Sequence, residues 1–68
     1  MQLSARNHLA GTIEEITEDA IVCHVVVRVG DHLIESVITR RSADELDLKK
    51  GDHVTAVVKA TEVMIAKP

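Results

Sequence analysis

The stretch AIVCHVVVRVGDHLIESVITR, residues 20–40, decides the fold class, because it reads as two strands joined by a tight turn. Its first half is rich in valine and isoleucine, whose branched side chains favour strands over helices. Gly30-Asp31 is a two-residue turn signal in which glycine supplies a positive φ. The turn sets the register and places Val29 opposite His32, so the sequence predicts an antiparallel hairpin.

The first strand of this hairpin, residues 20–29, has two different faces. One face is apolar throughout, since alternate residues share a side of a strand; its members are Ile21, Cys23, Val25, Val27 and Val29. The opposite face is half apolar, which is more than a solvated face requires. We expect this outer side to meet another subunit, and we expect Arg28 and Glu35, diagonal neighbours across the hairpin, to pair there.

The segments around the hairpin complete a small all-β pattern. Before the hairpin we expect a strand over 5–17 that bends near Gly11. After it we expect a helix of six to eight residues, which a capping box at Ser42 and Glu45 opens and Gly51 follows. Two further strands are expected over 52–59 and 62–67. This order predicts a five-stranded OB-like barrel with one short helix between the third and fourth strands.

Size and composition predict an oligomer. The chain has 68 residues, read as a single domain over 1–68, and one cysteine, so it has no disulfide framework. A domain this small buries only about 60% of the surface that its unfolded chain exposes. Because 46% of the residues are apolar, we expect self-association to cover part of that surface.

Charge and composition also exclude several function classes. The net charge is −3 and aromatic residues are absent, which disfavours nucleic-acid binding, since basic faces and stacking platforms are both missing. The same acidity disfavours an anionic membrane surface, and no apolar run approaches the roughly 20 residues that span a bilayer. The lone cysteine and the lack of a signal-peptide pattern predict a cytoplasmic location.

Two clusters of hydrogen-bond donors lie near the chain ends. Ser4-Ala5-Arg6 places a hydroxyl and a guanidinium two residues apart, on one side of an extended chain. Lys59-Ala60-Thr61 forms a second cluster of the same kind. Each alone also fits a surface ion pair, a solvated lysine or an ordinary strand threonine. Together, with no carboxylate within either cluster, they predict that the fold brings both ends around a small oxyanion.

The two end clusters, with Leu9, Gly11 and Ile13, resemble the molbindin (Mop) family. This resemblance implies an OB-like barrel that binds molybdate, with tungstate as its close analogue, for intracellular storage, buffering or homeostasis. It also implies a homohexamer, a trimer of dimers, with oxyanions held between subunits. The family's anion contacts would correspond to Ser4, Ala5 and Arg6 of one chain and to Lys59, Ala60 and Thr61 of its neighbour.

The alternative function is an oligomerisation or anion-sensing regulatory module that acts on a protein partner, such as a molybdate transporter or regulator. An enzyme is not expected, because no nucleophile triad, glycine-rich phosphate loop or paired-carboxylate site stands out. A bound metal cation is not expected either, since the four histidines lack ligand spacing and His24 and His32 lie on opposite faces of the hairpin. Cys23 is expected to be a small buried hydrophobe.

Overall fold

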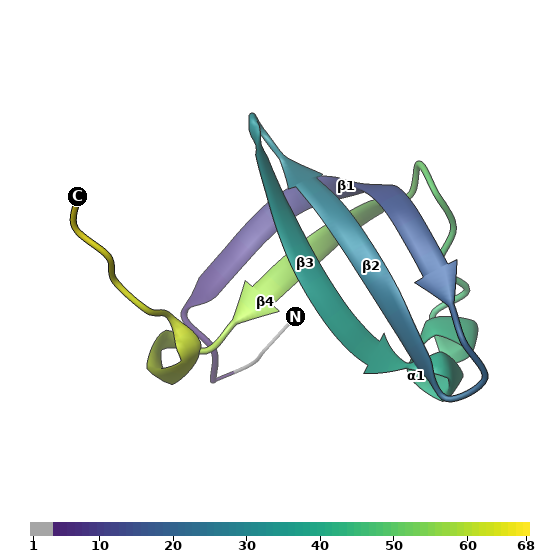
Figure 1. Cartoon of the computed structure of the whole chain (residues 1–68). Helices are drawn as coiled ribbons and strands as arrows, with labels where there is room; N and C mark the ends of the chain where they lie inside the picture. The colour runs from purple at the N-terminus through teal and green to yellow at the C-terminus, as the bar shows by residue number, and fades with distance from the viewer. Residues whose placement is uncertain (1–3) are drawn as a thin grey trace.

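The computed structural model describes residues 4–68. In chain order its elements are β1 (Asn7–Glu18), β2 (Val22–Val29), β3 (His32–Thr39), α1 (Arg40–Glu45), β4 (His53–Val58) and the 3₁₀ turn η1 (Ala60–Glu62). The strands form one four-stranded antiparallel sheet in the order β3-β2-β1-β4. The sheet is strongly coiled, so the β1–β4 arm crosses the β2–β3 arm in projection (Figure 1).

The β2–β3 hairpin has the register that the sequence predicts. Val29 is paired with His32 and Cys23 with Ile38, and Gly30 in the turn has a φ of 60°. The turn and the strand pattern are local signals that agree with each other. The register is therefore fixed by residues close together in the chain.

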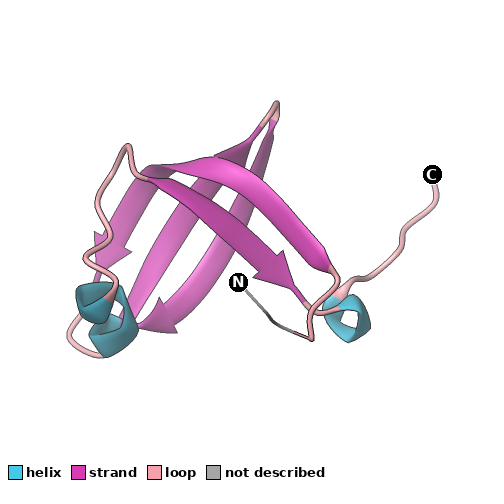
Figure 2. Cartoon of the chain, turned by 180° about the vertical axis from the view of Figure 1, so that it is seen from behind, coloured by secondary structure: helices cyan, strands magenta, loops and turns pink. Residues whose placement is uncertain are grey.

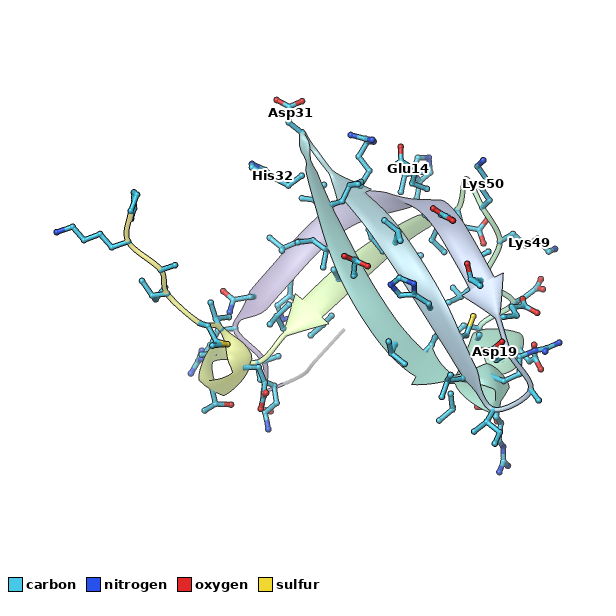
Figure 3. The ribbon with its side chains drawn as sticks, in the orientation of Figure 1. Glu14, Asp19, Asp31, His32, Lys49 and Lys50 are labelled. Atoms are coloured by element: carbon cyan, nitrogen blue, oxygen red, sulfur yellow. The ribbon has the colours of Figure 1, made fainter. Side chains whose placement is uncertain are left out.

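The expected pairing of Arg28 with Glu35 is wrong. Arg28 instead binds Glu14, with Nη2 2.6 Å and Nε 2.9 Å from Oε1. β1 shifts register between Ile13 and Glu15, so Glu14, which is labelled in Figure 3, is the extra residue of a bulge beside Arg28. Glu35 pairs with its other diagonal neighbour on the same face, the imidazole of His24, at 2.8 Å.

β1 joins the two halves of the sheet. Its first half, residues 7–12, pairs with β4, and its second half, residues 12–18, pairs with β2. The predicted bend near Gly11 therefore lies beside the place where β1 changes partner. A Cβ on Gly11 would lie 2.5 Å from the carbonyl oxygen of Arg28, so only glycine allows this approach of the two backbones. Figure 2 shows from behind how β1 curves across the sheet.

The helix begins earlier than the capping-box pattern predicts. β3 runs directly into α1, so Thr39 is the last residue with an extended backbone and becomes the N-cap. Its Oγ1 accepts a hydrogen bond from the Ser42 amide at 3.0 Å. The predicted cap at Ser42 is therefore wrong, because Ser42 already lies inside the helix.

The end of α1 also differs from the prediction. Asp47, with a φ of 51°, occupies the left-handed position after the helix in place of Gly51. The Leu48 amide donates to the Ala43 carbonyl at 3.2 Å, and the Asp47 amide donates to the Asp44 carbonyl at 3.1 Å. These two bonds form a Schellman motif, which ends the helix at Glu45, well before Gly51 is reached. Gly51 is in the left-handed region too, but in the turn before β4.

The hydrophobic core lies on the inner face of the coiled sheet, with α1 against β2 and β3 at one end. Five residues form its buried centre: Ile13, Cys23, Val25, Val27 and Ala43. The apolar face predicted for the first hairpin strand therefore lies inward at its middle positions, whereas Ile21, before β2, is exposed.

The predicted fifth strand over 62–67 is not formed, so the five-strand count is wrong for the single chain. After η1, residues 63–68 have no regular secondary structure and extend away from the sheet (Figure 1). Met64 and Ile65 are 93% and 90% exposed. The segment has a strand-like composition, but a strand needs an edge to pair with, and this one reaches none in its own chain. β3 and β4 therefore remain the outer strands, and the barrel is not closed by a fifth strand.

Candidate functional site

The start of β1 and the end of β4 lie side by side at one end of the sheet. Asn7 is paired with Val58, so the residues before Asn7 and after Val58 continue from the same pair. Ser4-Ala5-Arg6 and Lys59-Ala60-Thr61 are these flanking segments. The fold thus brings the two donor clusters of one chain to a common end, near η1 and far from α1 (Figure 1).

The cationic side chains of these clusters are exposed and form no ion pair within residues 4–68. Arg6 and Lys59 are both exposed. Within residues 4–68, neither forms a salt bridge with a carboxylate, whereas Arg28 and Arg40 both do. The two positive charges therefore remain available for an anion that approaches this end of the sheet.

Backbone donors are available in the same place. In the part of the chain that the structure describes, the amides of Ala5, Arg6, Ala60 and Thr61 donate to no backbone carbonyl. The Lys59 carbonyl accepts from the Glu62 amide at 2.9 Å, which closes the η1 turn. Ala60 carries only a methyl group, so a ligand can approach the backbone there. Hydroxyls, amides and two cations are the donor set that an oxyanion needs.

His8 is a contributor to this end that the sequence reasoning did not identify. Its Nε2 lies 2.8 Å from the carbonyl oxygen of Ala5, three residues earlier. A histidine near the start of a strand carries no spacing signal for such a contact, because the contact depends on the turn of residues 4–6. The structure therefore adds a side chain that touches the first donor cluster from within the same chain.

The remaining titratable groups do not form a second site. Among residues 4–68, no three His, Cys, Asp or Glu side chains gather closely enough to hold a metal ion. His53 Nδ1 lies 3.3 Å from Thr12 Oγ1 on the neighbouring strand. Cys23 has no exposed surface, and its burial, with a smaller contribution from Glu18, raises the pKa of its thiol. The thiol therefore stays protonated at neutral pH and is a poor nucleophile.

An apolar hollow lies on the inner face of the sheet, away from the donor clusters. Its volume is about 170 Å³, and its lining is mostly apolar, with Ile13, Ile38 and Leu48 among its members and Ser36 and Thr55 as its two hydroxyl residues. No charged side chain lines it, so it offers nothing to offset the charge of a dianion. No helix within residues 4–68 has the length and apolar character needed to span a bilayer.

Comparison with known proteins adds independent information. A family described as the TOBE domain matches residues 3–65. Molybdenum-pterin-binding protein 1 of Clostridium pasteurianum is 41% identical over 66 residues, which cover 96% of this chain and 97% of that protein.

Solved structures show the same fold. A molybdate binding protein from Sporomusa ovata superposes with a TM-score of 0.93 at 39% identity, over 98% of this chain and 100% of that one. The cytoplasmic molybdate-binding protein ModG, in a form with molybdate bound, gives a TM-score of 0.82 at 38% identity. That match covers 88% of this chain and 43% of ModG.

Proposed function

Because this chain belongs to the TOBE-domain family, and within it to the molbindin (Mop) proteins, we propose that it binds molybdate in the cytoplasm for storage, buffering or homeostasis. Tungstate, its close analogue, is expected to bind as well. The whole of residues 1–68 acts as one binding domain. The observation that carries the proposal is that both donor clusters lie at one end of the sheet, where Arg6 and Lys59 form no salt bridge with any carboxylate of residues 4–68.

The chemistry of the donors fits this anion. Molybdate is a tetrahedral dianion whose four oxygens accept hydrogen bonds and donate none at neutral pH. The Ser4 and Thr61 hydroxyls and the nearby amides supply donors, while Arg6 and Lys59 offset the two charges. Hydrogen bonds to charged groups of this kind contribute roughly 1.5–3 kcal/mol each. Nothing in this set activates a nucleophile or transfers a proton, so the proposed role is binding without catalysis.

The proposed site lies between chains. Every side chain of the two clusters except that of Ala5 is exposed, so one copy alone does not enclose an anion. Because both clusters of each chain lie at the same end of its sheet, two copies that meet there would place the clusters of both chains together. We assign Ser4, Ala5 and Arg6 of one chain and Lys59, Ala60 and Thr61 of its neighbour to one site. A subunit interface supplies a dry, preformed cavity and links anion binding to assembly.

The exposed tail supports assembly with further copies of this chain. Residues 62–67 have the composition of a strand, and Val63, Met64 and Ile65 are exposed. β3 and β4 each keep one edge free for a further strand. We propose that the tail of one copy pairs with an outer strand of another, within a homohexamer built as a trimer of dimers. The tail follows Thr61 directly, so this pairing carries the second donor cluster towards the neighbouring chain.

Calorimetric titration with molybdate, tungstate and sulfate tests the proposed function. We expect molybdate and tungstate to bind and the smaller sulfate to bind at least tenfold more weakly, since the site selects by size. Arg6→Ala is expected to weaken molybdate binding by at least tenfold, because it removes a charge-assisted donor. Thermal unfolding of this variant should shift by less than about 3 °C, since Arg6 is exposed and forms no salt bridge within residues 4–68.

Arg41→Ala is the matched control, because Arg41 is exposed and pairs with Glu45 on α1, at the other end of the sheet. It should leave the affinity unchanged. Absence of molybdate binding by the unmodified protein, or equal binding of sulfate, would refute the proposed function. Equal losses of affinity in both arginine variants would show that Arg6 acts through net charge alone.

A further inference from the structure

The His8 imidazole makes a defined contact with the first donor cluster. Its Nε2 is 2.8 Å from the Ala5 carbonyl oxygen. A carbonyl oxygen can only accept a hydrogen bond, so Nε2 must carry the proton and donate it. His8 itself is held in β1, where it is paired with Val57 of β4. The contact therefore ties the segment before the strand to a residue that the sheet already fixes.

The geometry of the peptide group extends this contact to the Arg6 amide. The Ala5 carbonyl and the Arg6 N–H belong to one peptide unit, and no cis peptide occurs within the described residues. In a planar trans unit these two groups point in opposite directions. Holding the Ala5 oxygen towards His8 therefore aims the Arg6 N–H away from the imidazole. That amide donates to no backbone carbonyl among residues 4–68, so it is free to meet an external acceptor.

The segment needs such support because the sheet does not reach it. Strand pairing begins at Asn7, so Ser4, Ala5 and Arg6 have no ladder hydrogen bonds of their own. Ala5 is only 9% exposed, which gives the segment one apolar anchor beside the imidazole contact. A donor segment that is ordered before the ligand arrives loses less conformational freedom on binding.

We propose that His8 is a positioning residue of the oxyanion site. Through its hydrogen bond to the Ala5 carbonyl, it orders residues 4–6 and directs the Arg6 amide, together with the donors beside it, at the bound anion. This inference rests on the proposed function, since it concerns the same site. His8 does not touch the anion; its effect passes through the backbone of Ala5 and Arg6.

Two substitutions of His8 test the role of its N–H donor separately from that of the imidazole ring. His8→Val removes the N–H but keeps a strand-forming residue, so the sheet is retained. His8→Gln keeps an N–H donor on a flexible side chain. The control is His53→Val, the same exchange at another exposed strand position, where the histidine contacts Thr12 rather than the donor segment.

Molybdate affinity is measured by calorimetry on the assembled protein, and the order of the Arg6 amide by its ¹H–¹⁵N heteronuclear NOE without anion. We expect His8→Val to weaken molybdate binding about three- to tenfold, the effect of one neutral hydrogen bond, and to lower the Arg6 NOE. His8→Gln should recover most of the affinity. His53→Val should change neither quantity.

The outcomes distinguish this inference from the proposed function. If the unmodified protein binds molybdate and His8→Val binds it equally well, the positioning role is overturned and the function stands. Equal weakening by His8→Val and His53→Val would also overturn it, since the effect would then not pass through Ala5. If the unmodified protein takes up no molybdate, the proposed function is wrong and the positioning role falls with it.

Discussion

At Gly11 the backbone of β1 passes against β2, and a side chain has no room there. A Cβ would lie 2.5 Å from the Arg28 carbonyl oxygen and 2.7 Å from Val27 Cγ1. We expect Gly11→Ala to lower the free energy of unfolding by about 1–3 kcal/mol, because one strand must move away from the other. Urea denaturation followed by far-UV circular dichroism, at several protein concentrations, measures this.

Gly30 provides the comparison for that experiment. It has a φ of 60°, and a Cβ at this position would have no atom within 4 Å. Gly30→Asn should change the stability by less than about 1 kcal/mol, since asparagine tolerates the left-handed region. Equal losses at both positions would show that the close approach at Gly11 is not what makes glycine necessary there.

The role of a single residue can be predicted from the sequence when its contacts are made with residues nearby in the chain. A lone glycine in a strand pattern indicated a bend near Gly11, and the structure has this bend. The close approach of the Gly11 and Arg28 backbones was not predictable, because Arg28 lies on another strand. Arg6 and Lys59 were predicted to contact an anion from their residue types, and the strand register brings the segments that carry them to one end of the sheet. His8 was missed because its contact arises only after residues 4–6 have turned.

At the scale of elements, the start of α1 can be tested directly. Thr39 Oγ1 accepts from the Ser42 amide, so Thr39→Ala should cost about 1 kcal/mol of stability. Ser42→Ala should cost less, because it improves helix propensity and leaves the cap in place. Thermal unfolding of both variants checks the order. A larger loss of stability for Ser42→Ala would show that Ser42 is the N-cap, as the sequence pattern indicated.

The elements differ in how far their sequences determine them. The β2–β3 hairpin is determined by a two-residue turn and by alternation on either side, so its register was predicted correctly. The helix was predicted with the right approximate length but a late start, because Thr39 and Ser42 both have the chemistry of an N-cap. Thr39 becomes the N-cap because β3 continues directly into α1 without a loop.

At the scale of the whole molecule, the tail and the free edges predict how copies associate. We expect removal of residues 63–68 to leave the four-stranded sheet folded, since Met64 and Ile65 make no part of the core. The full chain should sediment as a multiple of its 7.4 kDa mass, and the shortened chain should sediment near 7.4 kDa itself. Analytical ultracentrifugation, with circular dichroism as the test of folding, measures both.

Two point variants refine the truncation. Ile65→Ser should weaken assembly, because Ile65 is 90% exposed in one copy and is expected to be covered in the oligomer. Lys67→Ser removes a charged neighbour in the same tail and should have little effect. If the shortened chain keeps the mass of the full chain, the tail does not hold the copies together.

Composition predicts association of copies, whereas a single sequence does not predict its geometry. A 68-residue chain with 46% apolar residues, one cysteine and no aromatic residue has few other ways to become stable. Residues 62–67 have a strand-like composition, but the structure has no strand there. Composition indicates whether a segment suits a strand, whereas a strand also needs a partner edge, and a single sequence does not say which chain supplies it.

In the proposed assembly each copy donates one strand-like tail and offers two strand edges, one on β3 and one on β4. If two copies pair with each other's tails, both tails are covered and the exchange closes at a pair. If each copy passes its tail to a third, the same contacts generate a ring or an open filament, according to the angle at each junction. We expect the short link from Val58 through η1 to set that angle. A link that holds a single angle would favour the closed assembly of the proposed hexamer over an open filament.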